Sequence, residues 1–107
     1  MSLDNVKEQI EKDIQGNQVV VYMKGNKMAP MCGFSAQVVS IFTHLGVEFE
    51  TKDVMIDDEL RQAIKEFSNW PTFPQVFVKG ELIGGCDITT EMYQSGELQK
   101  LLETQPA

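Results

Sequence analysis

The sequence predicts an α/β fold, in which a four-stranded mixed sheet is flanked by helices on both faces. Two observations lead to this prediction. The first half of the chain reads as helix, strand, helix, strand, and a strand-helix-strand unit requires parallel strands and a right-handed crossover. The second half carries the signal of a hairpin around Lys79-Gly80, whose strands must be antiparallel. One mixed sheet covered by helices on both faces is the simplest arrangement that accommodates both halves.

The first predicted helix covers residues 2–15. Its apolar residues recur at helical spacing and are Leu3, Val6, Ile10 and Ile14. Ser2 is expected to cap the start of this helix, and Gly16 is expected to end it. The stretch QVVVYM, residues 18–23, is a nearly continuous run of apolar, largely β-branched side chains. This composition favours a strand that is buried on both faces of a sheet.

Residues 24–31, KGNKMAPM, are predicted to form a loop because glycine and proline punctuate them. A second helix is predicted from Phe34, where apolar residues return at helical spacing, and Gly46 is a natural stop for it. The stretch VEFETKDV, residues 47–54, begins with alternating side chains and predicts a second strand.

A third helix follows, and Asp57 or Asp58 is expected to cap its start. Its apolar positions are Leu60, Ile64 and Phe67. Residues 68–74, SNWPTFP, contain two prolines and interrupt regular structure. The stretches QVFV and ELIGG, at residues 75–78 and 81–85, then form the predicted hairpin.

The chain ends in a last helical region, for which Asp87, Thr89 and Thr90 offer N-caps. We expect this region to be interrupted at Ser95-Gly96 and to resume over residues 98–102. The predicted order of elements is therefore α-β-α-β-α-β-β-α.

Length and composition limit the classes of protein that this chain can represent. Its 107 residues show no repeat or linker-like stretch and indicate a single domain spanning residues 1–107. The formal net charge of −7 argues against a nucleic-acid-binding surface, which is usually a basic stripe. No apolar run is long enough to span a membrane, and the polar N-terminus is not typical of a signal or transit peptide. We therefore expect a cytoplasmic protein, in a reducing compartment where cysteines stay as thiols.

Cys32 and Cys86 are the only cysteines in the sequence, which is too few for a disulfide framework. Their spacing, together with the single His44, matches no zinc site. Free cysteines are often buried and inert, because the thiol packs like a small apolar group. We favour this interpretation for Cys86, since it ends an apolar strand.

Cys32 calls for a different interpretation, because it falls at the first turn of the second predicted helix. Unpaired backbone N–H groups and the positive end of the helix dipole favour a thiolate there. Lys24 and Lys27, in the preceding loop, are expected to add positive charge. A cysteine in such a place typically has a pKa of roughly 3.5–7.5 instead of about 8.5. Its thiolate is both a nucleophile and a metal ligand, so both functions stay open.

Two further segments carry chemical information. In WPTFPQVF, Pro74 lies directly before a strand, and a residue without an N–H must sit at the strand's start. A cis Phe73-Pro74 bond would present the backbone of Phe73 toward the second helix, whereas a trans bond would give an ordinary turn. In GGCD, residues 84–87, the glycines permit close approach of a ligand. Asp87 then caps a helix, holds a ligand amine, or does both.

The motifs KGNKMAPMCGFS and WPTFPQVFVKGELIGGCD, in this order, resemble the monothiol glutaredoxins of the CGFS class, which have the thioredoxin fold. The resemblance extends from Val6 to Leu102, and no motif position departs from it. It implies a single glutaredoxin domain with a glutathione site. In that site Lys24 meets glutathione near the active cysteine, and Arg61 pairs with the glycine carboxylate. Without the resemblance, Arg61 would be interpreted as a solvated arginine on a helix surface.

The resemblance also assigns the other side of the glutathione site. It implies that Phe73, before a cis Pro74, pairs through its backbone with the cysteinyl part of glutathione. It implies further that Cys86 and Asp87 hold the γ-glutamyl end.

Ser35 stands where a dithiol protein carries its second cysteine, and a serine cannot resolve a mixed disulfide. One hypothesis is therefore a monothiol oxidoreductase that uses glutathione as the resolving thiol and reduces glutathionylated substrates. Cys86 is a distant candidate for the resolving role, which would require its Cα to come within about 7 Å of that of Cys32.

The other hypothesis uses Cys32 as a metal ligand. A [2Fe-2S] cluster usually takes four thiolates, and the resemblance implies that Cys32 and one glutathione from each of two chains supply them. It also implies a homodimer through the shared cluster, mixed complexes with BolA-like proteins, and delivery to apo iron–sulfur proteins in cluster assembly and iron homeostasis. In the CGFS class the extended loop between Lys24 and Cys32 is associated with poor oxidoreductase activity. We therefore predict a cluster carrier that is at most a weak enzyme. The oxidoreductase and a binding module without chemistry are the alternatives.

Overall fold

Residues 3–103, which the computed structural model describes, contain helices and strands in nearly the predicted order. The helices are α1 (Leu3–Gly16), α2 (Gly33–Leu45), α3 (Asp58–Ser68), α4 (Cys86–Ser95) and α5 (Glu97–Glu103). The strands are β1 (Val19–Met23), β2 (Gly25–Asn26), β3 (Ala29–Pro30), β4 (Glu50–Asp53), β5 (Gln75–Val78) and β6 (Glu81–Gly84). Ser2, the expected cap of the first helix, lies outside the described residues.

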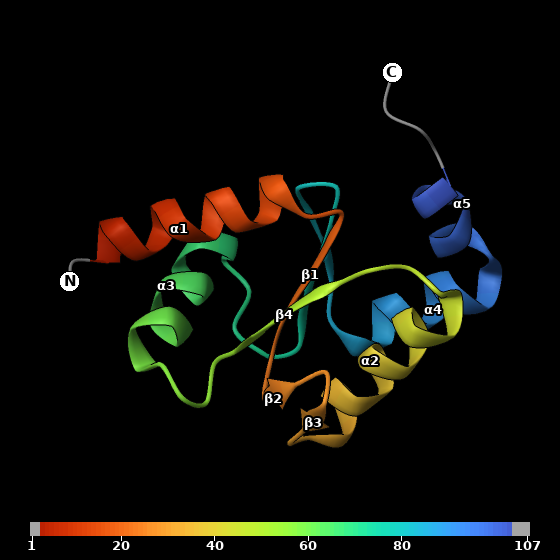
Figure 1. Cartoon of the computed structure of the whole chain (residues 1–107), viewed down its shortest axis with the longest axis horizontal. Helices are drawn as coiled ribbons and strands as arrows, with labels where there is room; N and C mark the ends of the chain where they lie inside the picture. Colours follow the sequence, from red (N-terminus) through yellow and green to blue (C-terminus); the bar gives the residue numbers. More distant parts are fainter. Residues whose placement is uncertain (1–2, 104–107) are drawn as a thin grey trace.

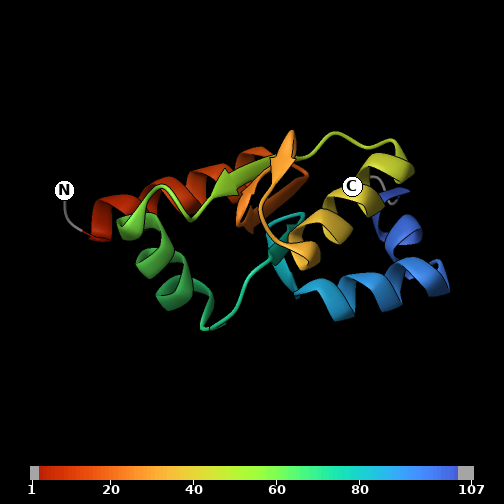
Figure 2. The same cartoon turned by 90° about the horizontal axis from the view of Figure 1, so that it is seen from below.

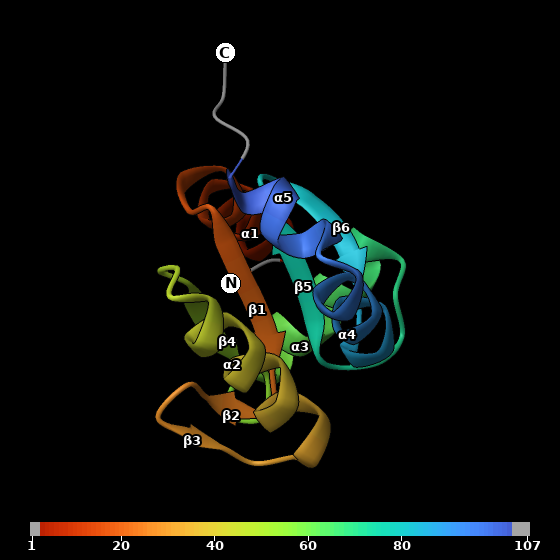
Figure 3. The same ribbon diagram turned by 90° about the vertical axis from the view of Figure 1, so that its right-hand side faces the viewer.

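Four of the strands form one mixed sheet in the order β4-β1-β5-β6 (Figure 3). β1 runs parallel to β4, with Val20 opposite Glu50, and antiparallel to β5, with Val20 opposite Phe77. β5 and β6 form the antiparallel hairpin. The mixed sheet predicted from the two halves of the sequence is therefore confirmed.

β1 lies at the centre of the molecule, and all five of its residues are buried. Because side chains alternate along a strand, Val19, Val21 and Met23 pack with α2, α4 and α5 on one face. Val20 and Tyr22 pack with α1 and α3 on the other face. Figures 1 and 2 show the two groups of helices on opposite sides of the sheet. No helix within residues 3–103 is long and apolar enough to cross a membrane.

The helix boundaries agree with most of the predicted signals. Gly46 ends α2 in the left-handed conformation, with φ 74°. Of the two candidate caps for α3, Asp57 is the N-cap, and its carboxylate accepts a hydrogen bond of 3.0 Å from the N–H of Leu60. The caps predicted for the last helical region are wrong. α4 begins at Cys86, with Gly85 as its N-cap, so Asp87 already lies in the first turn.

Two strand predictions also need correction. The loop predicted over residues 24–31 contains the β2–β3 hairpin, because the side chain of Asn26 accepts hydrogen bonds from the N–H groups of Met28 and Ala29 and closes a tight turn. β4 begins at Glu50, three residues after the predicted Val47. In the register with β1, Val47 and Glu48 fall opposite Asn17 and Gln18, which lie in the turn between α1 and β1 and offer no strand.

Candidate functional site

The seven predicted site residues all line one hollow of about 740 Å³, a size typical of small-ligand sites. Five segments contribute to it, and Figure 2 shows the starts of α2 and α4 close to the segment that joins α3 to β5. The lining residues are Lys24, Cys32, Phe34, Arg61, Lys65, Trp70, Pro71, Thr72, Phe73, Pro74, Gly85, Cys86, Asp87 and Ile88. The fold thus brings together predicted site residues that lie as far apart in the sequence as Lys24 and Asp87.

Cys32 is the N-cap of α2, with extended backbone angles of φ −152° and ψ 141°. Its side chain is partly exposed at the hollow. The backbone N–H groups of Ser35 and Phe34 face the sulfur and lower the pKa of the thiol, and the charge of Lys24 lowers it further. The helix start therefore favours a thiolate at Cys32, as the sequence predicts.

Ser35, in the place of a second redox cysteine, is fully buried. Its Oγ accepts a hydrogen bond of 3.3 Å from the N–H of Lys24, at the end of β1. The same hydroxyl contributes to the lowered pKa of Cys32, because it donates toward the sulfur. Ser35 thus links the end of β1 to the start of α2 and supports the thiolate.

Replacing Ser35 with alanine is expected to raise the pKa of Cys32, since a donor to the thiolate is lost. The rate of Cys32 alkylation by iodoacetamide follows the thiolate fraction, so its pH profile should shift to higher pH. Ser40→Ala, on an exposed position of the same helix, is the matched control and should leave the profile in place. Profiles of Ser35→Ala and the unchanged chain that coincide would contradict this role.

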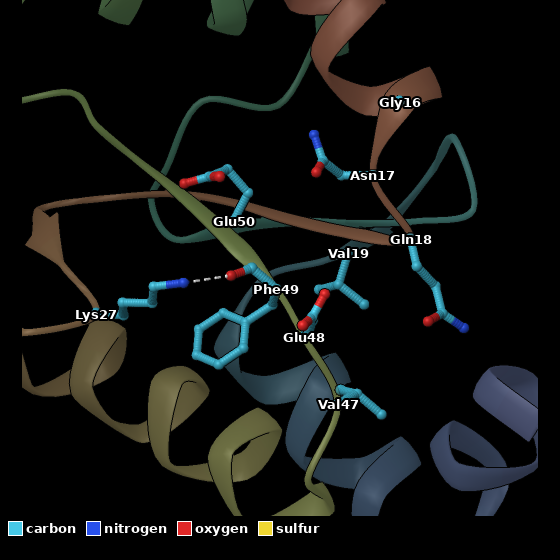
Figure 4. Close-up of a pocket in the computed structure, with 9 residues that line it drawn as sticks. All are labelled: Gly16, Asn17, Gln18, Val19, Lys27, Val47, Glu48, Phe49 and Glu50. Atoms are coloured by element: carbon cyan, nitrogen blue, oxygen red, sulfur yellow. Dashed lines mark hydrogen bonds between the residues drawn. The ribbon is translucent and has the colours of Figure 1, made fainter.

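Lys27 does not lie beside Cys32, and this part of the sequence prediction is wrong. Its Nζ donates a hydrogen bond of 2.8 Å to the carbonyl of Phe49 and lies 5.3 Å from the centroid of the Phe49 ring. The β2–β3 hairpin turns the side chain toward β4, and Figure 4 shows it there. The hollow drawn in Figure 4, between residues 16–19 and 47–50, contains none of the seven predicted site residues.

The Phe73-Pro74 bond is cis, which decides between the two alternatives left open by the sequence. Pro74 is buried directly before β5. The loop before it is closed by Gln75, a buried residue whose Nε2 donates a hydrogen bond of 2.8 Å to the carbonyl of Trp70. Phe73 is therefore held at the hollow by a short, well-connected loop.

Cys86 lies at the start of α4 and is 8% exposed. Burial raises the pKa of its thiol, and the nearby charges of Asp87 and Cys32 raise it further. The hydroxyl of Thr90 lies 3.9 Å from its sulfur. The two cysteines of the hollow therefore differ in acidity, since the pKa of Cys32 is lowered toward the thiolate and that of Cys86 is raised toward the neutral thiol.

Arg61 and Lys65 project from successive turns of α3 into the same hollow. The guanidinium of Arg61 is exposed and bonds the carboxylate of Asp58 at 3.0 Å, an exposed pair that is easily exchanged for another anion. Lys65 Nζ lies 5.8 Å from the centroid of the Phe73 ring. Sequence reasoning missed Lys65 and Trp70. The spacing of Lys65, four residues after Arg61, was the signal for the lysine.

Exposed apolar side chains lie at and near the hollow. Phe34 and Ile88 line it and are 62% and 38% exposed, and Met31, the residue before Cys32, is 70% exposed. Within residues 3–103, no three His, Cys, Asp or Glu side chains come close enough together to hold a metal ion. A metal at Cys32 would therefore need ligands from outside this part of the chain.

Fold and site together define a protein of the thioredoxin fold, with one thiolate at a helix start and a cis-proline in the same hollow. The sequence profile of the glutaredoxin family matches residues 19–83. The probable monothiol glutaredoxin 2 of Rickettsia felis is 57% identical over 96 residues, which is 90% of this chain and 92% of that protein. The chain belongs to the monothiol glutaredoxins. The family predicted from the CGFS and Trp-Pro motifs is thus confirmed.

Solved structures agree with this assignment. The solution structure of reduced poplar apo GrxS14 superposes with a TM-score of 0.85 at 47% identity, covering 96% of this chain and 95% of that one. The crystal structure of a buckwheat glutaredoxin-glutathione complex superposes with a TM-score of 0.83 at 27% identity, covering 94% and 89%. The predicted thioredoxin fold is confirmed.

Proposed function

We propose that this protein binds glutathione in the hollow beside Cys32 and carries a [2Fe-2S] cluster, shared with a second chain, to apo iron–sulfur proteins. The observation that carries the proposal is the isolation of the Cys32 thiolate. Ser35 replaces the resolving cysteine, and the thiol of Cys86 is buried with a raised pKa. A thiolate without a partner in its own chain is free to bond outside it.

Glutathione suits the hollow because its two ends are charged and its centre is a peptide. Arg61 supplies a cation for the glycine carboxylate, and Lys24 supplies a cation that meets glutathione near Cys32. On the opposite side of the ligand, the first turn of α4 offers free N–H groups to the γ-glutamyl carboxylate, and Asp87 offers a carboxylate to its ammonium. The related buckwheat glutaredoxin was solved as a complex with glutathione.

The backbone of Phe73, before the cis Pro74, is proposed to pair with the cysteinyl part of glutathione. This pairing would bring the glutathione sulfur near Cys32, since both residues line the same hollow. Cys86 is proposed to contact the γ-glutamyl end, where its neutral thiol avoids adding a second negative charge.

The ligand count supports a cluster shared between two chains. A cluster of this type usually takes four thiolates, of which one chain offers Cys32. Two chains with two bound glutathiones complete the set. The exposed Met31 and Phe34 beside Cys32 provide an apolar rim for a second protein to contact. This second protein is a copy of the chain or, as the family implies, a BolA-like partner.

We place this activity in the cytoplasm, in cluster assembly and iron homeostasis. Both cysteines are free thiols in the structure, and a reducing compartment keeps them so.

The alternative function is a glutathione-dependent thiol-disulfide oxidoreductase, and the lowered pKa of the partly exposed Cys32 favours it. The Cys32 thiolate would attack the glutathione sulfur of a glutathionylated substrate and release the substrate thiolate. A second glutathione would then attack the Cys32–glutathione disulfide, which restores Cys32 and leaves glutathione disulfide.

Anaerobic reconstitution with ferrous iron and sulfide, with and without glutathione, tests the proposal. A coloured species with the mass of two chains is expected only when glutathione is present. Colour that does not depend on glutathione would contradict the shared ligand set. No colour, together with rapid turnover of a glutathionylated peptide, would favour the oxidoreductase.

A further inference from the structure

Asp53, at the end of β4, is bonded to the segment that carries Lys24. Its Oδ1 accepts two backbone hydrogen bonds, one of 3.1 Å from Gly25 and one of 2.8 Å from Met55. Bonds to a carboxylate are stronger than bonds between neutral groups. The parallel pairing of β1 and β4 places Met23 opposite Asp53, and the N–H of Val54 donates to the carbonyl of Met23 at 2.9 Å. Both neighbours of Lys24 are thus fastened to the end of β4.

The backbone around Lys24 has little freedom apart from these bonds. Gly25 is buried with φ +85°, and a Cβ there would lie 2.4 Å from the carbonyl oxygen of Ala29. The N–H of Lys24 donates to Ser35 at 3.3 Å, and its carbonyl accepts from Met31 at 2.9 Å. The direction in which the Lys24 side chain leaves the backbone is therefore set by its surroundings, and Asp53 provides the charged contact among them.

We propose that Asp53 is a positioning residue for the glutathione site, which it serves by fixing Gly25 and thereby aiming Lys24 into the hollow. This inference rests on the proposed function, because it assumes that Lys24 contacts glutathione. A lysine has a long, flexible side chain, so its ammonium is useful to a ligand only when its backbone is held. Loss of the Asp53 carboxylate leaves the buried N–H of Gly25 without its acceptor and loosens the base of the β2–β3 hairpin.

A double-mutant cycle with oxidised glutathione tests the proposal. The measured quantity is the equilibrium constant for Cys32–SH plus glutathione disulfide giving the Cys32–glutathione disulfide plus glutathione, followed by mass spectrometry of the whole chain. Asp53→Ala and Lys24→Met are each expected to lower this constant about tenfold, the scale of one lost charged hydrogen bond. The double variant is expected to match Lys24→Met within about twofold, because Asp53 acts through Lys24.

Two further variants separate positioning from a general loss of structure. Asp53→Asn keeps an oxygen that accepts both N–H groups, so it should stay within about threefold of the unchanged chain. Glu50→Ala, on the same strand, removes a carboxylate that accepts the N–H of Thr51 far from the hollow, and it should have no effect. If Asp53→Ala does not fold, Asp53→Ser takes its place in the same cycle, because the serine side chain is shorter than that of Asp53.

The outcomes distinguish the two levels of the proposal. If the equilibrium constant of the double variant falls about a hundredfold, which is the product of the two single effects, the proposal that Asp53 acts through Lys24 is overturned. If the equilibrium constant for Asp53→Asn is as low as that for Asp53→Ala, the role of the two hydrogen bonds is overturned. An unchanged chain that forms no disulfide with glutathione would instead overturn the proposed glutathione site.

Discussion

Replacing Cys32 with serine is expected to abolish formation of the mixed disulfide with glutathione and retention of a cluster. The lowered pKa makes Cys32 the more acidic thiol of the hollow, and a serine hydroxyl is neither ionised nor a soft ligand at neutral pH. The rate of reaction with glutathione disulfide should fall by at least about a thousandfold, since the nucleophile itself is removed.

Cys86→Ser is compared with Cys32→Ser to identify the reacting sulfur, since the proposed contact of Cys86 with the γ-glutamyl end affects how tightly glutathione is held and not which sulfur bonds to it. Cys86 lines the same hollow, but its thiol is buried and its pKa is raised, so it is neither the nucleophile nor the preferred ligand. Mass spectrometry after exposure to glutathione disulfide should show the added glutathione on Cys86→Ser and none on Cys32→Ser. Colour that is retained after reconstitution of Cys32→Ser, or that is lost only in Cys86→Ser, would contradict the assignment of the cluster ligand to Cys32.

Gly25→Ala is expected to lower the free energy of unfolding by about 3 kcal/mol or more. Alanine strongly disfavours the φ of +85° at this position. Its Cβ would also lie 2.4 Å from the Ala29 carbonyl oxygen and 2.7 Å from the Met31 nitrogen, which are backbone atoms that cannot move aside without opening the hairpin.

Two other glycines separate the contributions to this effect. Gly46 has φ +74°, but a Cβ added there would meet no atom within 4 Å, so Gly46→Ala should cost only the conformational term of about 1–2 kcal/mol. Gly16, at the end of α1, has neither constraint, and Gly16→Ala should be neutral or stabilising by up to about 1 kcal/mol. Urea unfolding at equilibrium measures all three. Equal losses for Gly25→Ala and Gly46→Ala would show that the crowding at Gly25 is relieved.

Much of the fold could be predicted because its signals are local. The run from Val19 to Met23 is buried on both faces, and Gly46, Asp57 and Gly96 mark helix boundaries where they were expected. One error occurs where a distant contact decides the outcome, because the start of β4 is set by the register with β1. The other is a local signal that was not recognised, since the side chain of Asn26 closes the turn of the β2–β3 hairpin.

In the candidate site, too, some features could be predicted from the local sequence and others depend on how distant segments pack. The position of Cys32 at a helix start follows from the sequence around it, and its lowered pKa follows from the helix. The gathering of Arg61, Lys65 and Trp70 around it depends on how α3 packs against the sheet, which no local pattern reveals. Lys24 and Lys27 look equivalent in the sequence. However, Lys24 precedes the β2–β3 hairpin and lines the hollow, whereas Lys27 lies in the turn of the hairpin and bonds the carbonyl of Phe49.

The position of Lys27 also affects how two copies of the chain can meet. β4 is an edge strand, and such an edge normally invites a strand from another molecule to add to the sheet. Here the ammonium of Lys27 occupies the carbonyl of Phe49, and the carboxylate of Glu50 occupies the N–H of Thr51. Backbone groups that are already bonded offer no template for strand addition. The edge of the sheet at β4 is thereby protected against strand addition by another molecule.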